Sequence, residues 1–94
     1  MTDVVDPASN YYAGPCQELD ATGLICPEPV MLLHNRMRTL SAGEVLCVRA
    51  TDPASERDVS RFCEFLGHTL LAVRSEERLA AEVLYSFWIK KKSE

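Results

Sequence analysis

The sequence lacks long runs of apolar residues. Its longest uninterrupted apolar runs contain only a few residues, far short of the roughly 20 that span a bilayer. No apolar segment of the signal-peptide kind follows Met1, so we expect a cytoplasmic protein that does not enter membranes. Positive charge is also scarce, since 10 Lys and Arg stand against 14 Asp and Glu. The resulting net charge of -4 disfavours direct, tight binding of nucleic acid.

Closely spaced cysteines are absent as well. The four cysteines, Cys16, Cys26, Cys47 and Cys63, include no Cys-x-x-Cys spacing, which disfavours a compact zinc site. We expect reduced thiols, because cytoplasmic proteins seldom hold disulfides. Neither a metal nor an organic cofactor is expected.

The length of 94 residues, 47% of them hydrophobic, predicts one small globular domain. A domain of this size builds a modest core and no deep cavity, so any chemistry is expected near its surface. Residues 1–17 contain Pro, Gly, Asn and Ser without a helical or strand period, which predicts a flexible N-terminal tail. The folded domain is expected over residues 18–94.

The apolar periodicity predicts a β-α-β-α-β-β order. Pro27 and Pro29 mark the first turn of the first helix, where a missing N–H group is tolerated. Thr51 or Asp52 is expected to cap the second helix. The predicted elements are a strand at 19–21, a helix at 30–40, a strand at 44–50, a helix ending at 66, a strand at 68–74, a polar turn at 75–78 and a strand at 83–89.

This order predicts an α/β (α+β) fold, a two-layer sandwich with two helices packed on one face of a four-stranded mixed sheet. The loops that follow parallel strands emerge at the same edge of a sheet. We therefore expect the loop that contains Cys26 to lie beside the loop at 51–53.

Cys26 is the strongest candidate for a reactive group. It precedes a predicted helix, whose positive N-terminal pole favours a thiolate, whereas Glu28 in the same turn opposes it. Together these effects predict a moderately activated thiol. The alternative interpretation is that Cys26 is a small apolar residue beside a helix start.

The other candidates are weaker. Cys47 and Cys63 fall at apolar positions and are expected to be buried and inert, and Cys16 lies in the predicted tail. No motif surrounds His34 or His68. Asp52, Arg57 and Asp58 are candidates for docking a partner, although charges near a helix start are more often only solvated. The basic run at 90–92 is expected to be a solvated tail, with a weak contact to phosphate or an acidic partner as the alternative.

The stretch 19–31, which contains Cys26-Pro27-Glu28-Pro29, closely resembles the Cys-Pro-x-Pro signature of the TusA (SirA-like) sulfur-carrier family. Further matches lie at 50–54, 57–59, 62–63 and 88–91, so the resemblance covers about residues 18–92.

This resemblance implies a carrier-type sulfurtransferase that holds sulfur as a persulfide on the catalytic Cys26, framed by Pro27, Glu28 and Pro29, with Asp58 as a docking residue. It implies a cysteine desulfurase of the IscS type as donor and a TusBCD-like relay as acceptor. The relay supports 2-thiolation of the wobble uridine of tRNA. Among relatives, molybdenum-cofactor assembly and sulfur oxidation are the alternatives. A monomer suits such a shuttle.

Two departures from the family pattern stand out. Ile25 precedes the cysteine where family members commonly have a basic or polar residue, which removes one source of thiolate stabilisation. The N-terminal segment with Cys16 is also longer than the family core. Two rival hypotheses remain: a non-catalytic interaction module, and a redox switch that pairs Cys16 with Cys26.

Overall fold

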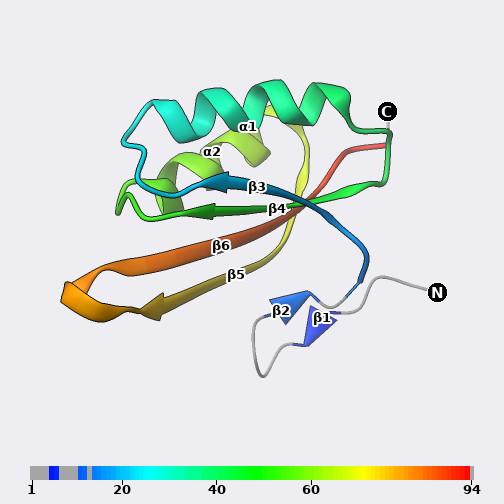
Figure 1. Ribbon diagram of the computed structural model, residues 1–94. Coiled ribbons are helices and arrows are strands. Elements are labelled where there is room, and N and C mark those ends of the chain that lie inside the picture. Colours follow the sequence, from blue (N-terminus) through cyan, green and yellow to red (C-terminus); the bar gives the residue numbers. More distant parts are fainter. Residues whose placement is uncertain (1–4, 7–10, 13, 94) are drawn as a thin grey trace.

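The computed structural model describes residues 5–6, 11–12 and 14–93. Two helices cover one face of a four-stranded sheet, as Figure 1 shows. The four strands of this sheet are β3 (Gln17–Ala21), β4 (Val45–Ala50), β5 (Thr69–Glu77) and β6 (Val83–Lys90). The helices are α1 (Glu28–Thr39) and α2 (Ser55–Leu66), so the predicted two-layer α/β sandwich is confirmed.

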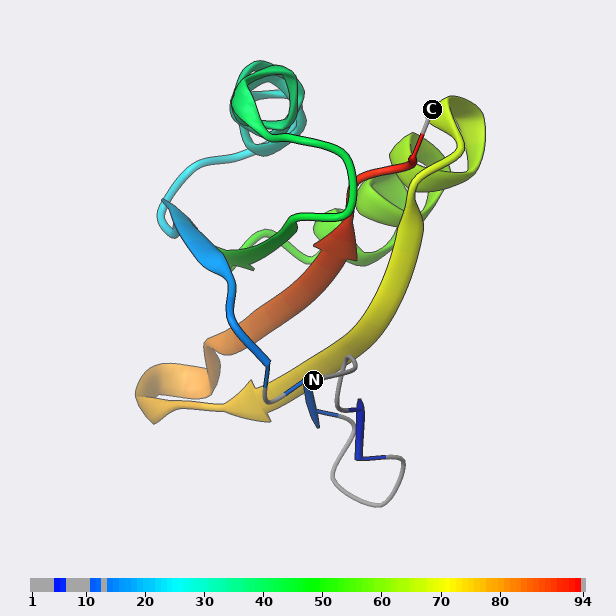
Figure 2. The ribbon, with the colours of Figure 1, turned by 90° about the vertical axis from the view of Figure 1, so that its right-hand side faces the viewer.

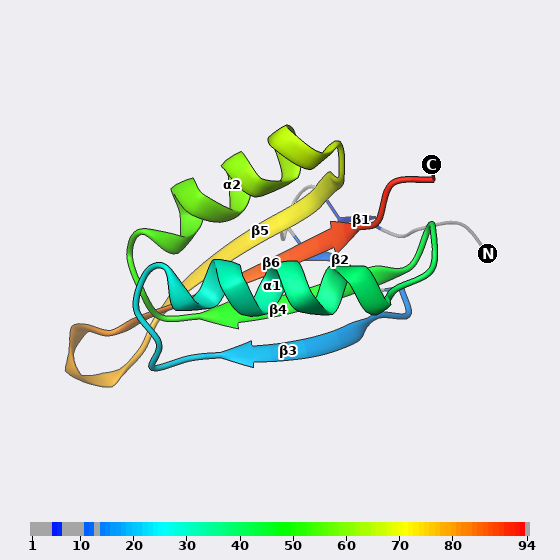
Figure 3. The same ribbon diagram turned by 90° about the horizontal axis from the view of Figure 1, so that it is seen from above.

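The strand order is β3-β4-β6-β5. Strand β3 runs parallel to β4, from the pair Gln17 and Leu46 to the pair Ala21 and Ala50. Strand β6 lies between β4 and β5 and is antiparallel to both, which makes the sheet mixed, as predicted. In Figure 3, the helices lie side by side over these strands, and both helices begin at the same end of the molecule.

The main core lies between the helices and the sheet. Leu33 of α1 and the strand residues Leu46, Val48, Phe87 and Ile89 are fully shielded from solvent there. Alternate residues of β4 point to the opposite face, where Val45 and Cys47 form a second cluster with Tyr12, Ala72 and Trp88. Cys63 is buried in the main core, so the predicted burial of Cys47 and Cys63 is confirmed.

Part of the predicted flexible tail, residues 1–17, lies outside the described residues, and its flexibility stays a prediction. Within the described part, β1 (Val5–Asp6) pairs with β2 (Tyr11–Tyr12) as a short antiparallel ladder. The side chain of Tyr12 is 2% exposed and packs in the second cluster. Figure 1 accordingly shows this ladder on the side of the sheet away from the helices.

Three local predictions were wrong. The third strand does not end at 74: β5 continues to Glu77 because residues 75–77 pair with β6, and the turn is displaced to the 3-10 helix η1 (Leu79–Ala81). Ladder pairing outweighs the polar character of this stretch. Neither Thr51 nor Asp52 caps α2, which begins after Ala54 without a side-chain cap. The basic run at 90–92 is not a free tail, because Lys90 belongs to β6 and Lys91 Nζ donates to Leu40 O at 2.7 Å.

Replacing Leu33 with Ala should lower the free energy of unfolding by about 2–5 kcal/mol, because the fully buried side chain leaves a cavity between α1 and the sheet. Urea denaturation measures this change. Leu79→Ala is the matched control, since Leu79 is 93% exposed and its loss should cost less than about 0.5 kcal/mol. Equal stability of the two variants would contradict this placement of the core.

Candidate functional site

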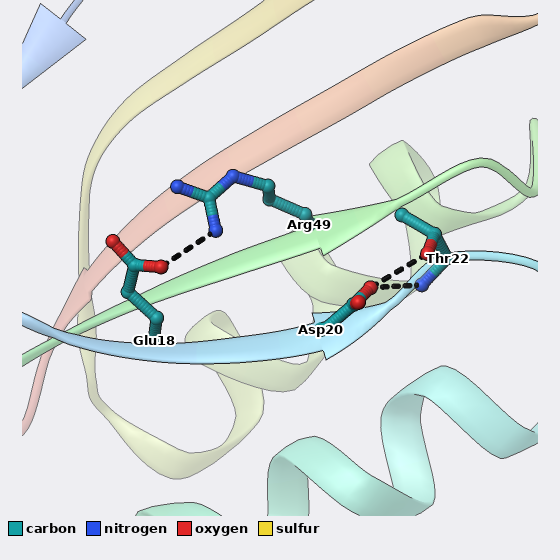
Figure 4. A network of polar contacts seen from close by, with 4 residues as sticks. All are labelled: Glu18, Asp20, Thr22 and Arg49. Atoms are coloured by element: carbon teal, nitrogen blue, oxygen red, sulfur yellow. Dashed lines mark hydrogen bonds and ion pairs between the residues drawn. The ribbon is translucent and has the colours of Figure 1, made fainter.

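The loop between β3 and α1 holds Cys26 at the edge where β3 and β4 end. The Asp20 carboxylate shapes the exit from β3: its Oδ1 accepts from the Thr22 N–H at 3.0 Å and from the Thr22 hydroxyl at 2.6 Å, as Figure 4 shows. These two bonds turn the chain away from the sheet. On β3 and β4, Glu18 and Arg49 form an ion pair of 2.9 Å, which is also visible in Figure 4.

The two loops that follow β3 and β4 are neighbours, as predicted. The Gly23 N–H donates to Thr51 Oγ1 at 2.9 Å, and the Cys26 N–H donates to Asp52 Oδ2 at 2.6 Å. The second oxygen of Asp52 accepts from the Ala54 N–H at 3.1 Å. Asp52 therefore joins the Cys26 loop to the start of α2. Sequence reasoning gave it the roles of helix cap and docking residue and missed this positioning role.

The prolines frame the start of α1. Pro27 is the residue before the helix, Pro29 lies in its first turn, and the Cys26–Pro27 peptide bond is cis. The N–H of Glu28 donates to Ile25 O at 2.9 Å, and the N–H of Met31 donates to Pro27 O at 3.1 Å. Cys26 therefore lies just before the first helical turn, with its side chain exposed to solvent.

The thiol of Cys26 is hydrogen-bonded to the carboxylate of Asp58 in the first turn of α2. This bond is the largest cause of a raised Cys26 pKa, followed by desolvation and by the negative charges of Asp58 and Asp52. Arg57 opposes the shift, and its guanidinium pairs with Asp58 at 3.1 Å. The same thiol hydrogen bond is the largest cause of a lowered Asp58 pKa.

The predicted activation of Cys26 is therefore wrong in direction. A helix N-terminus favours a thiolate, but it equally favours carboxylates, and Asp52 and Asp58 occupy that position at α2. Their charges oppose a second negative charge on the sulfur. The resting side chain is a neutral thiol. The acidic residues at the start of α2 were the sequence signal for this effect.

Apolar side chains surround the thiol. A shallow hollow of about 330 Å³ is lined by Cys26, Pro27, Val30, Asp58, Arg61, Phe62 and Phe65. Phe65 is 88% exposed, and Ile25 and Met31, near Cys26 in the chain, are also largely exposed. Sequence reasoning missed this surface. The signal was Phe65, a large aromatic residue outside the apolar stripe that Val59, Phe62 and Leu66 form on α2.

The other cysteines are placed differently. Burial raises the pKa of Cys47 and of Cys63 to about 11. Cys16 is exposed and precedes β3, whereas Cys26 follows it, so the two cysteines lie at opposite ends of this strand. Five strand residues alone separate them by roughly 15 Å, well beyond the Cα separation that a disulfide spans. The fold therefore contradicts the Cys16–Cys26 redox switch.

The two histidines, His34 in the middle of α1 and His68 just after α2, do not line the hollow beside the thiol. Their rings flank Phe62, with centroid distances of 5.9 Å for His34 and 5.7 Å for His68. Nδ1 of His68 accepts from the Lys92 N–H at 3.1 Å. The described residues contain no group of potential ligands able to hold a metal ion, and none of the described helices has the length and apolar character that crossing a membrane requires.

Comparison with known proteins gives a consistent picture. Residues 17–91 match the family model described as "Sulfurtransferase TusA". A protein of Pseudomonas syringae pv. syringae (strain B728a) named sulfur carrier protein TusA is 53% identical over 77 residues, which cover 82% of this chain and 86% of the relative. A protein of the same name from Pseudomonas entomophila (strain L48) is 48% identical over 94 residues, which cover 100% of both chains.

Among solved structures, the crystal structure of a SirA-like protein from Desulfitobacterium hafniense superposes with a TM-score of 0.56 at 22% identity. The match covers 76% of this chain and 93% of the other. At this identity the likeness establishes the fold.

Replacing Asp58 with Asn should lower the pKa of Cys26, because it removes both the hydrogen bond and the charge that favour the neutral thiol. The rate of alkylation by iodoacetamide at pH 7 should then rise about three- to tenfold, since the thiolate is the reactive form. Glu64→Gln removes one charge from α2 and should leave the rate unchanged. A rate that is unchanged or lower in Asp58→Asn would contradict the described contact.

Proposed function

The chain belongs to the TusA family of sulfurtransferases, and we propose that it carries sulfur as a persulfide on Cys26. The family consists of sulfur carriers, and the role of Cys26 is the step beyond that membership. The supporting observation is its position: Cys26 is exposed in a loop held by Asp52, beside a largely exposed apolar surface. Cys47 and Cys63 are buried, and no partner reaches them without unfolding the core.

The transfer is an exchange at sulfur. Sγ of Cys26 attacks the terminal sulfur of a donor persulfide, a new S–S bond forms, and the S–S bond of the donor breaks. The proton that leaves Cys26 ends on the released donor thiolate, so a thiol and a persulfide yield a persulfide and a thiol. No electrons are gained or lost overall. In the second half, an acceptor thiolate attacks the terminal sulfur and Cys26 leaves.

The chain's own residues have three roles in this exchange. Asp52 fixes the backbone of Cys26 through its N–H. Asp58 holds the thiol proton in the resting state and so keeps the fraction of thiolate low. The exposed Ile25, Met31 and Phe65 give a partner an apolar surface beside the thiol. Arg57, which is 58% exposed, remains a candidate for docking. Pro27, Glu28 and Pro29 place the cysteine at the helix start.

For the partners, we propose a cysteine desulfurase of the IscS type as donor and a TusBCD-like relay as acceptor, in the cytoplasm. We propose that this relay supplies sulfur for 2-thiolation of the wobble uridine of tRNA. Sulfur delivery to molybdenum-cofactor assembly or to sulfur oxidation is the alternative. A small carrier with an exposed thiol fits each of these, because the acceptor is selected by surface contacts.

Incubation with a cysteine desulfurase, cysteine and pyridoxal phosphate should add about one sulfur atom to the wild-type protein, detected by intact mass spectrometry. The addition should disappear in Cys26→Ser and persist in Cys16→Ser, the control that removes the other exposed cysteine. Persistence of the added mass in Cys26→Ser would refute the assignment of Cys26. The interaction-module hypothesis predicts no addition to any of the three proteins.

The pathway is tested in a bacterial strain that lacks its own carrier. Expression of the wild-type chain should restore 2-thiouridine in tRNA, measured by nucleoside mass spectrometry, because Cys26 supplies the sulfur. Cys26→Ser should not restore it. Restored molybdoenzyme activity without 2-thiouridine would favour the alternative pathway.

A further inference from the structure

A second cavity, of about 180 Å³, lies between the C-terminal parts of α1 and α2. Its lining residues on α1 lie roughly 9–15 Å along the helix from the Cys26 end, and it shares Phe62 with the hollow beside Cys26. Three apolar residues and five basic residues line it, and we call this set the basic pocket. Its members are Met37, Phe62, Leu66, His34, Arg38, His68, Lys91 and Lys92.

Backbone hydrogen bonds bring Lys91 and Lys92 to the basic pocket. After β6 the chain continues to pair with the segment that precedes β4: the Gly43 N–H donates to Lys91 O at 3.0 Å, and the Lys91 N–H donates to Glu44 O at 2.8 Å. The Lys92 N–H then donates to His68 Nδ1 at 3.1 Å. Figure 2 shows this red C-terminal segment passing between the connection that follows α1 and the turn that follows α2.

The C-terminal end of α1 favours two of these cations, Lys91 and Arg38, and Arg38 lies in the last turn of this helix. Lys91 Nζ donates to Leu40 O at the end of α1, a favourable place for a positive charge. Arg38 donates from Nη2 to Asn35 Oδ1 at 2.9 Å, which leaves other N–H groups of its guanidinium. The stem of Lys92 lies over Gly67, whose added Cβ would be 3.7 Å from Lys92 Cδ. None of the ion pairs that the described residues form includes Arg38, Lys91 or Lys92.

The pocket therefore collects donors without a negative charge to balance them. None of its described lining residues is acidic, although the whole chain has a net charge of -4. Because Nδ1 of His68 accepts a hydrogen bond, the neutral ring carries its proton on Nε2, which is a further donor. Burial lowers the pKa of His68, and the positive charges of Lys92 and Lys91 lower it further.

We propose that the basic pocket binds a phosphate-type oxyanion, either free or as a monoester that carries an apolar group. Donors from three directions, on α1, after α2 and after β6, suit a tetrahedral anion better than a planar carboxylate. Arg38 and Lys92 supply the charge, and Met37, Phe62 and Leu66 offer an apolar wall to an ester group. This site shares the side chain of Phe62 with the hollow beside Cys26, but none of its charged residues takes part in the proposed sulfur transfer, so either assignment can fail without the other.

Titration of the full chain with sodium phosphate, followed by NMR at constant ionic strength against sodium chloride, tests the proposal. Saturable shifts are expected around Arg38, Gly67, His68 and Lys92. The pKa of His68 should rise on binding, because a bound anion favours the imidazolium form. Shifts that do not saturate, or that chloride reproduces, would overturn the proposal.

The double variant Arg38→Gln/Lys92→Gln should weaken phosphate binding at least about tenfold, because it removes two charge-assisted donors. Both side chains are exposed, so the fold should survive, and the spectrum of the free variant checks this. Arg74→Gln is the control, since this exposed arginine lies on β5 in an ion pair with Glu76 outside the pocket. Equal affinity of the wild-type and double-variant proteins would refute the site.

Two further ligands identify the source of the anion. Phenyl phosphate that binds more tightly than inorganic phosphate supports a monoester as the natural ligand, and equal affinity supports a free oxyanion. Titration with acetate tests whether the pocket distinguishes a phosphate-type anion from a carboxylate. Saturation by acetate with the same dissociation constant as phosphate would overturn the assignment to a phosphate-type anion and favour an acidic peptide.

Discussion

The carboxylate of Asp52 is the contact on which the site depends. One oxygen accepts from the Cys26 N–H and the other from the Ala54 N–H, so a single side chain joins the loop after β3 to the loop after β4. Parallel pairing of β3 with β4 brings the two loops to the same edge of the sheet, as Figure 3 shows. Together with the hydrogen bond from the Gly23 N–H to Thr51 Oγ1, this contact fixes the position of Cys26 relative to the first turn of α2. The hydrogen bond between the Cys26 thiol and the Asp58 carboxylate depends on this position.

The raised pKa of Cys26 affects the two halves of a sulfur exchange differently. A thiol of higher pKa is a better nucleophile once ionised, but less of it is ionised at neutral pH and it is a poorer leaving group. A resting neutral thiol also reacts slowly with oxidants and alkylating agents, which react with the thiolate. The carboxylates of Asp52 and Asp58 thus lower the thiolate fraction, and with it the reactivity, of the exposed cysteine. For a carrier that travels between proteins, this protection is useful.

The spacing of the apolar residues and the positions of the turn residues were enough to predict the helices and the four strands of the main sheet, their order and the covering of one sheet face by the helices. The loop contacts were predictable in part: parallel strands placed Cys26 beside residues 51–53, but the periodicity did not reveal which oxygen of Asp52 meets which N–H. Asp58 was a candidate for docking a partner, while its bond to the thiol depends on how α1 and α2 are positioned on the sheet. The extension of β5 to Glu77 was missed because strand pairing with β6, a non-local effect, overrides local polarity.

The charges at the two ends of the helix pair have a common physical origin. Acidic residues stand at the starts of both helices, among them Glu28 and Asp58, and Arg36 and Arg38 stand in the last turn of α1, which complements the dipole of that helix. The last turn of α2 has no basic residue of its own, and the stem of Lys92 lies over Gly67 at its end. This arrangement stabilises α1, and it places carboxylates beside Cys26 and cations in the basic pocket. The charges of Asp58 and Asp52 raise the pKa of Cys26, so a partner that brings a positive charge to this surface would meet these carboxylates and lower the pKa of the thiol. Under the proposed function, docking of such a partner would therefore increase the reactivity of the thiol. An exposed cysteine can in this way react selectively with its partners, although no pocket encloses it.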